Sequence, residues 1–267
     1  MAPRTVPPPP GAALLPGADE AAPSRGTGAP LALVTGAGTG IGAACARALA
    51  AEGFRVALHY RQSAAAANAL AEELPDAFAL QADLADAAAV EALIGVLAAR
   101  AGRVDMLVNN AGTNVDGLLA TTKLEDYDAV TALLRGTWYL TKLVLRRFML
   151  RQGSGRIVNI SSVVGHTGSA GQAPYTMAKA GLDALTKSMA QELAGRAILV
   201  NSVAPGFIDT EMTAPLPAER RAEILARVPL GRLGAAAEVA DAVAWLATRA
   251  SYVHGTVIHV NGGLYGG

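Results

Sequence analysis

The sequence predicts an α/β protein that forms a single domain around a doubly wound, parallel sheet of seven strands. From Leu31 onward, short apolar runs alternate with longer segments of helical period, which favours parallel strands joined by crossover helices. The chain has 267 residues, 52% of them hydrophobic, which is enough to bury a substantial core in one domain. A glycine-rich turn lies between the first apolar run and the first helical segment, at residues 35–42, where such folds require one.

The expected strands and helices follow from the alternation of apolar runs and segments of helical period. Strands are expected at the apolar runs, residues 31–35, 55–60, 77–82, 106–109, 156–161, 198–204 and 256–260. Helices are expected between them, at residues 40–52, 64–74, 87–100, 126–150 and 175–193. The pattern fails at residues 206–221, where prolines and mixed charges predict a mobile loop with a short helix.

The first residues differ in composition from everything that follows. Eight of the 14 prolines fall within the first thirty residues, and such a segment cannot build a core. It also lacks the basic start and continuous apolar stretch of a secretory signal. We therefore expect residues 1–29 to be a disordered extension, or alternatively to lie upstream of the true start, and residues 30–267 to form the domain.

Charge and cysteine content exclude several classes of function. Basic and acidic residues number 22 each, so no overall field draws the protein to nucleic acid or to an anionic membrane. No apolar run reaches the roughly 18–20 residues that a membrane span needs. The single cysteine, Cys45, excludes an intramolecular disulfide framework and a cysteine-built zinc site. These features predict a cytoplasmic protein with no nucleic acid, membrane or metal partner.

The glycine-rich turn carries the first chemical signal. Residues 35–42 read TGAGTGIG. In a turn between strand and helix, glycines permit positive φ and let backbone amides approach a pyrophosphate, whose charge the helix N-terminus stabilises. Spaced glycines also arise by chance in a chain with 29 of them, but the position of this turn favours a Rossmann-type dinucleotide site.

The residues after the second expected strand bear on the choice of dinucleotide. Residues 59–63 read HYRQS, without the carboxylate that would bind the ribose hydroxyls of NAD. Arg61 and Ser63 could instead hold a 2′-phosphate through charge-assisted hydrogen bonds. The alternative is a solvated arginine at a strand end. We expect NADPH as the cofactor, with NADH less favoured.

Three further residues predict acid catalysis. Tyr175 and Lys179 stand four apart and share one helical face, so the ammonium can favour ionisation of a phenol whose usual pKa is about 10. Alone, this spacing occurs in any amphipathic helix. Ser162 follows the strand expected at 156–161 and stands thirteen residues before Tyr175, and this third residue favours a catalytic site over a chance spacing. Tyr175 would then protonate a carbonyl oxygen as hydride arrives from the nicotinamide, while Ser162 orients that carbonyl.

Taken in order, these motifs resemble the short-chain dehydrogenase/reductase family over residues 31–267. The glycine spacing is that of the family, and it is followed by Asp83-Leu84, the sequence NNAG at 109–112, Ser162, YTMAK at 175–179, and Pro205-Gly206. The resemblance implies that Ser162, Tyr175 and Lys179 are catalytic. It implies the following cofactor contacts: Gly36, Thr39, Gly40, Ile41, Tyr60, Arg61, Asp83, Leu84, Asn109, Ala111, Gly112, Tyr175, Lys179, Pro205, Gly206, Ile208 and Thr210.

Several of these roles come from the resemblance alone. Lys179 would contact the nicotinamide ribose, Asp83 would meet the adenine edge, and residues 205–210 would cover the nicotinamide. Asn109 would support both the central strand and the cofactor, with a purely structural turn residue as an equal alternative. The family commonly has a catalytic Asn where this chain has Leu133, and leucine cannot hold the water that the Asn helps to bind.

The substrate class also follows from resemblance. Residues 161–175 and the ending IHVNGG at 258–263 resemble the 3-oxoacyl-[acyl-carrier-protein] reductase branch. This implies reduction of a 3-oxoacyl thioester carried by acyl-carrier protein or CoA, and a homotetramer built through the two long helices and the C-terminal segment. Arg151 and Arg196 lie near the positions that receive the carrier protein in that branch, unless they only solvate helix ends.

Alternatives remain open at this point. One is a reductase of another small ketone or alcohol, and another is a weakly active cofactor-binding subunit, which Leu133 motivates. His166 has no acidic neighbour in the sequence and is expected to be structural or part of a substrate loop. Cys45 is expected to be a small buried side chain without chemistry.

Overall fold

The computed structural model describes residues 28–211, 213–214 and 217–266. The expected N-terminal extension, residues 1–29, lies outside the described residues except for its last two. Within the described ranges, no helix is both long and apolar enough to cross a membrane.

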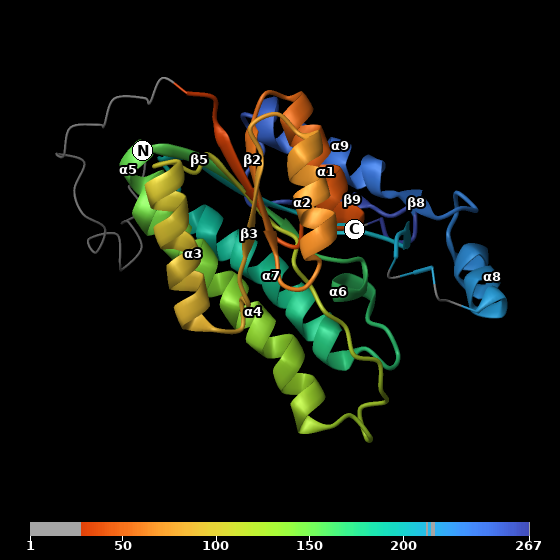
Figure 1. Ribbon diagram of the computed structural model, residues 1–267. Coiled ribbons are helices and arrows are strands. Elements are labelled where there is room, and N and C mark those ends of the chain that lie inside the picture. Colours follow the sequence, from red (N-terminus) through yellow and green to blue (C-terminus); the bar gives the residue numbers. More distant parts are fainter. Residues whose placement is uncertain (1–27, 212, 215–216, 267) are drawn as a thin grey trace, which may run out of the picture.

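A seven-stranded parallel sheet forms the centre of the molecule, as predicted (Figure 1). The strands lie in the order β3-β2-β1-β4-β5-β6-β9. Successive strands are therefore added on one side of β1 up to β3, and on the other side of β1 from β4 onward. Such a switch point opens a crevice at the carboxyl ends of the strands. The strands are β1 (Leu31–Val34), β2 (Arg55–Tyr60), β3 (Phe78–Gln81), β4 (Met106–Asn109), β5 (Ser154–Ile160), β6 (Ala197–Pro205) and β9 (Val257–Val260).

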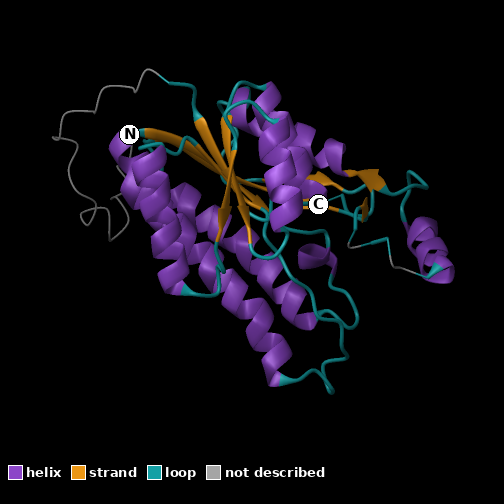
Figure 2. Ribbon diagram, viewed as in Figure 1, coloured by secondary structure: helices purple, strands orange, loops and turns teal. Residues whose placement is uncertain are grey.

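Helices cover both faces of this sheet (Figure 2). One layer consists of α1 (Gly40–Ala51), α2 (Ala64–Glu73) and α9 (Ala236–Thr248). The other layer consists of α3 (Ala87–Arg100), α4 (Leu124–Val144) and α7 (Ala173–Glu192). The remaining elements are short: a π-helical turn (Leu145–Met149), α5 (Leu150–Gln152), α6 (Val164–Thr167), α8 (Ala218–Arg227) and the strand pair β7 (Ile208–Asp209) and β8 (Gly234–Ala235).

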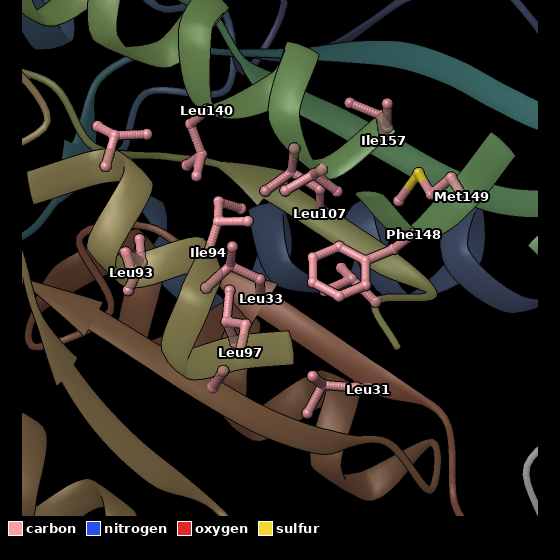
Figure 3. Packing of buried hydrophobic residues seen from close by; sticks show 14 of the residues in the cluster. Leu31, Leu33, Leu93, Ile94, Leu97, Leu107, Leu140, Phe148, Met149 and Ile157 are labelled. Carbon is pink, nitrogen blue, oxygen red and sulfur yellow. The ribbon is translucent and has the colours of Figure 1, made fainter. Parts of the chain in front are cut away.

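The central strand shows why the sheet needs two helical layers. All four residues of β1 are fully buried. Because successive side chains of a strand point to opposite faces, Leu31 and Leu33 pack into the core under α3 and α4, whereas Ala32 and Val34 pack into the core under α1 and α9. Figure 3 shows Leu31 and Leu33 in the first of these cores, among leucines of the neighbouring elements.

The structure differs from the sequence-based elements mainly at their ends. The long helix expected at 126–150 begins two residues earlier and contains the π-helical turn, which no sequence periodicity announces. The irregular segment at 206–221 contains the strand β7 and the start of α8; its residues 212 and 215–216 are not described. Cys45 is buried on α1 as expected, and burial raises the pKa of its thiol to about 12.

Candidate active site

A cavity of about 240 Å³ opens where the carboxyl ends of the central strands meet the glycine-rich turn. It brings together residues that are far apart in the sequence but that follow β1, β4, β5 and β6. The lining residues are Gly36, Thr39, Gly40, Ile41, Asn110, Gly112, Ile160, Ser161, Ser162, Tyr175, Lys179, Pro205, Gly206, Ile208, Thr210, Glu211 and Thr213. Most of the expected site residues are therefore in one place, and five further lining residues were not among them: Asn110, Ile160, Ser161, Glu211 and Thr213.

The glycine-rich turn has a backbone that other residues could not adopt. Gly36 and Gly40 have φ values of +62° and +54°. A Cβ atom at Gly42 would lie 2.1 Å from the carbonyl oxygen of Gly36, so the first turn of α1 packs directly on the loop. The Thr39 side chain does not cap this helix. The amides of the first turn of α1 thus remain available to a bound anion, which fits the pyrophosphate of a dinucleotide.

Asn110 holds this turn in place. Its side-chain amide donates to the carbonyl oxygens of Thr35 (2.9 Å) and Gly36 (3.0 Å), and its backbone amide donates to the Thr35 hydroxyl (2.9 Å). The hydroxyl of Thr35 also accepts from the amide of Ala111 (3.0 Å). The sequence marks this contact only by the Asn-Asn pair at the end of β4. The structure shows that β4 lies next to β1 and that Asn110, not Asn109, reaches the turn.

The side chain of Asn109 faces the protein interior and does not line the cavity. Its amide donates to Thr141 (2.9 Å) and to Asn159 (2.8 Å), and Asn159 donates in turn to Thr186 (2.7 Å). These buried bonds tie β4 and β5 to α4 and α7. The structural alternative therefore describes the Asn109 side chain, because its amide hydrogens are used inside the core.

The expected cofactor contacts near β2 and β3 differ in how their side chains are placed. Leu84 packs its side chain into the core beneath α3 and α4, so only its backbone can face a ligand. Asp83 is exposed, and its carboxylate accepts from the amide of Ala85 (2.9 Å), which fixes the turn after β3. Arg61 is exposed and Tyr60 half-buried at the end of β2, which leaves the guanidinium free to meet a ligand phosphate.

His59 is a buried residue of this region that the sequence analysis did not single out. It is 2% exposed, its Nδ1 accepts from the amide of Gly36 (3.2 Å), and its Nε2 lies 3.0 Å from the carbonyl oxygen of Ala82. A backbone amide can only donate and a carbonyl can only accept, so the ring must be neutral with its hydrogen on Nε2. Burial lowers the pKa of His59, which favours this neutral form.

We predict that His59 makes the fold sensitive to acid. Because its pKa is lower in the folded chain than in the unfolded chain, its contribution to stability is complete above the unfolded value of about 6.5 and is lost as the pH falls toward the folded value. The free energy of unfolding should decrease by up to about 1.4 kcal/mol per pH unit from this group. In urea unfolding at a series of pH values, His59→Asn should show a smaller loss between neutral and acid pH; an equal loss in both proteins would contradict this role.

Lys179 is buried at the floor of the cavity. Its ammonium donates to the carbonyl oxygen of Ile160 (2.7 Å) and lies 5.5 Å from the centre of the Tyr175 ring. Burial lowers the pKa of Lys179 to about 8, against an opposing attraction from Asp183. A Cβ atom at Gly112 would stand 3.5 Å from the Lys179 Nζ, in ordinary van der Waals contact, so Gly112 lies directly beside the ammonium.

Tyr175 and Ser162 face each other at the mouth of this arrangement. The hydroxyl of Ser162 hydrogen-bonds to Tyr175 and lowers the pKa of the phenol, but burial has the larger effect and raises that pKa above its usual value. The ammonium of Lys179 was expected to favour ionisation of this phenol, whereas burial raises its pKa and favours the neutral form. A neutral phenol at physiological pH is suited to donate a proton to an oxygen that gains negative charge.

Leu133 occupies the position where the family commonly has an Asn. It lies on α4, is half-buried, and packs against the core beneath that helix. The leucine is thus accommodated as an ordinary apolar contact, and it offers no hydrogen bond to a water near Lys179.

Arg151 and Arg196, which the resemblance linked to carrier-protein binding, lie before the amino ends of two central strands. Arg151 precedes β5 and Arg196 precedes β6, whereas Ser162 follows β5. In a parallel sheet the amino ends of the strands form the opposite edge from the carboxyl ends. Within one chain, Arg151 and Arg196 therefore lie at the edge of the sheet remote from the cavity, and their contact with a carrier protein stays a prediction.

Comparison with known proteins agrees with the geometry of the site. The sequence matches the family described as enoyl-(acyl carrier protein) reductase over residues 36–265, which include the glycine-rich turn, Ser162, Tyr175 and Lys179. The chain belongs to the short-chain dehydrogenase/reductase family. The resemblance expected from the motifs is thereby confirmed.

Curated members of this family match almost along their whole length. A 3-oxoacyl-[acyl-carrier-protein] reductase of Synechocystis is 48% identical over 243 residues, which cover 88% of this chain and 97% of the relative. The corresponding FabG proteins of Escherichia coli and Staphylococcus aureus are 47% and 46% identical, with the same coverage. The matches thus span most of this chain and nearly the whole of each relative.

Proposed function

We propose that this protein reduces a 3-oxoacyl thioester to the 3-hydroxyacyl form with NADPH, in fatty-acid or polyketide-type biosynthesis. The observation that supports this most is the placement of Ser162, Tyr175 and Lys179 beside the glycine-rich turn in one cavity. The substrate class follows from the curated relatives, which are named for 3-oxoacyl-[acyl-carrier-protein] reduction.

The chain's own residues account for the proton side of the reaction. A bound reduced nicotinamide supplies the hydride. Ser162 donates a hydrogen bond to the carbonyl oxygen of the substrate and holds it next to Tyr175. Tyr175 transfers its phenolic proton to that oxygen as negative charge develops there. The buried ammonium of Lys179 stabilises the phenolate that remains, because opposite charges attract strongly where water is excluded.

The preference for NADPH is supported by the residues at the end of β2. Arg61 is exposed there with no neighbouring carboxylate in residues 59–63, and Ser63 packs against the glycine-rich turn. A Cβ atom at Gly38 would lie 2.2 Å from the Ser63 Oγ, so this hydroxyl sits next to the expected pyrophosphate turn. This arrangement supports the proposal that Arg61 and Ser63 bind the 2′-phosphate that distinguishes NADPH from NADH.

Arg61→Ala should therefore reduce the preference for NADPH. We expect KM for NADPH to rise by about tenfold or more and KM for NADH to stay unchanged, because one charge-assisted contact to the phosphate is lost. Initial rates at varied cofactor concentration measure both constants. Arg249→Ala, at an exposed arginine paired with Glu52, is the matched control and should change neither. Equal changes for the two cofactors would contradict the assignment.

The partners of the reaction are also part of this proposal. The substrate would be an acyl-carrier protein or acyl-CoA thioester, and the protein would act in the cytoplasm as a homotetramer. Exposed apolar side chains on the two long helices, Trp138 on α4 and Met177 on α7, support contacts between copies of the chain. Since Arg151 and Arg196 lie away from the cavity of their own chain, carrier-protein binding is supported by the named relatives rather than by these arginines.

Two observations favour competing assignments. The description of the matched family points to reduction of the carbon–carbon double bond of an enoyl thioester. Leu133 in place of the family Asn favours a weakly active subunit that works beside an active homologue. A third alternative is a reductase of another small ketone or alcohol.

One assay separates these assignments. NADPH oxidation by the purified chain is followed optically with a 3-oxoacyl thioester, a 2-enoyl thioester and a small ketone, for the natural protein and for Leu133→Asn. The proposal predicts oxidation with the 3-oxoacyl thioester well above the other two. Activity only after Leu133→Asn would identify a weakened subunit, and preference for the enoyl thioester or the ketone would replace the proposed substrate.

A further inference from the structure

A buried carboxylate lies on the same helix as the proposed catalytic pair. Asp183 is 3% exposed and stands one turn after Lys179 on α7, which itself stands one turn after Tyr175. Side chains four apart on a helix have Cβ atoms about 5–6 Å from each other. Burying an unpaired carboxylate costs several kcal/mol, so its presence requires compensation from neighbouring groups.

Hydrogen bonding does not supply this compensation. The Oδ2 atom of Asp183 lies 2.9 Å from Nε2 of His166 on α6, which is an ion-pair contact when the imidazole is protonated, while neither carboxylate oxygen has a partner with hydrogen-bond geometry among the described residues. His166 thus has an acidic neighbour that the sequence alone did not reveal. By contrast, Thr186, also on the buried face of α7, bonds to Leu182 and Ser202.

Charged and titratable groups surround the carboxylate instead. His166 faces it from α6, Lys179 from the preceding turn of α7, and His259 from β9. Tyr265 of the C-terminal segment packs on both histidine rings, with ring centres 5.1 Å from His166 and 5.0 Å from His259. The two histidine rings are 4.8 Å apart. Burial lowers the pKa of Lys179 and, together with His166, that of His259, and the Asp183 charge opposes this lowering in both.

We propose that Asp183 is a positioning residue whose buried carboxylate, seated against His166, holds Lys179 in the ammonium form that Tyr175 needs. This proposal rests on the proposed function. It explains why an acid stands on the buried face of α7 without a hydrogen-bond partner: a charge at this place acts on Lys179 through the low-dielectric interior, where attraction between opposite charges is strong. The charge of Asp183 then acts on Lys179, and the charge of Lys179 acts on Tyr175, at successive turns of α7.

The test measures the ionisation of Lys179 directly. Lysine side chains are labelled with carbon-13 at the ε position, the Lys179 signal is assigned with Lys179→Arg, and its chemical shift is followed from about pH 6 to about pH 10. In Asp183→Asn the midpoint should fall by about one pH unit or more, because the ammonium loses a nearby opposite charge. The alkaline limb of the pH profile of kcat for thioester reduction should move in the same direction.

Glu192→Gln is the matched control, since it removes the same charge from the same helix. Glu192 is exposed and ends α7, about 20 Å from Lys179 along the axis. It should leave both the Lys179 midpoint and the activity unchanged. If Asp183→Asn does not fold, Asp183→Ala provides the same measurement with a smaller apolar side chain. An unchanged Lys179 midpoint, or an equal shift in Glu192→Gln, would overturn the proposal.

The two proposals fail in different ways. A shifted Lys179 midpoint in Asp183→Asn, in a protein that reduces no thioester, would support the electrostatic role and overturn the reaction. Thioester reduction with an unmoved midpoint would support the reaction and overturn the role of Asp183.

Discussion

Tyr175→Phe should abolish thioester reduction while leaving NADPH binding intact. The substitution removes only the hydroxyl, and with it the proton that the carbonyl oxygen requires, whereas the ring that packs beside Lys179 remains. We expect kcat to fall by at least about 100-fold, the usual contribution of a positioned general acid. Steady-state kinetics gives kcat, and the change in nicotinamide fluorescence on titration gives the affinity for NADPH.

The control for this variant is Tyr252→Phe. Tyr252 is fully exposed, so loss of its hydroxyl should affect neither kcat nor cofactor affinity. Turnover of Tyr175→Phe close to that of the natural protein would refute the assignment of the proton donor. A loss of NADPH affinity as large as the loss of kcat would show instead that the hydroxyl serves binding.

Gly42→Ala should have the largest effect on the cofactor site. The new methyl group would stand 2.1 Å from the Gly36 carbonyl oxygen in the glycine-rich turn and 2.6 Å from the side-chain amide nitrogen of Asn110, which holds that turn. Either the turn or α1 must shift, which should lower the free energy of unfolding by about 1–3 kcal/mol and remove measurable NADPH binding. Urea unfolding and cofactor titration measure these two effects.

Gly95→Ala is the corresponding control. Gly95 is exposed within α3, and a Cβ atom there would meet nothing within 4 Å. Alanine should therefore raise the free energy of unfolding by about 0.5–1 kcal/mol through helix propensity and leave the cofactor affinity unchanged. Tight NADPH binding by Gly42→Ala would mean that the close contact in the turn is not needed for the site.

Local patterns predicted the sheet well because its strands are apolar runs and its helices are long. The strands at β1, β2 and β4 begin where the apolar runs begin, and the glycine-rich turn lies after β1 as the pattern requires. The order of the strands required the structure. The relation of Ser162 to Tyr175 was also foreseen, since a strand end and the following helix start are neighbours along the chain.

Contacts between distant segments could not be predicted in this way. His59 and Asn110 hold the glycine-rich turn from β2 and from the end of β4, and neither has a local signal that separates it from an ordinary polar residue. Asp183 meets His166 only because α6 and α7 pack together.

Transfer of deuterium to the substrate tests the central claim most directly. NADPH that carries deuterium at C4 of the nicotinamide, on the face that is transferred, is incubated with the purified protein and a 3-oxoacyl thioester, and the product is analysed by mass spectrometry. The account predicts a 3-hydroxyacyl thioester with one deuterium on C3 and no such product from Tyr175→Phe. Deuterium at another carbon of the acyl group, or no deuterium transfer by a protein that binds NADPH, would contradict the account.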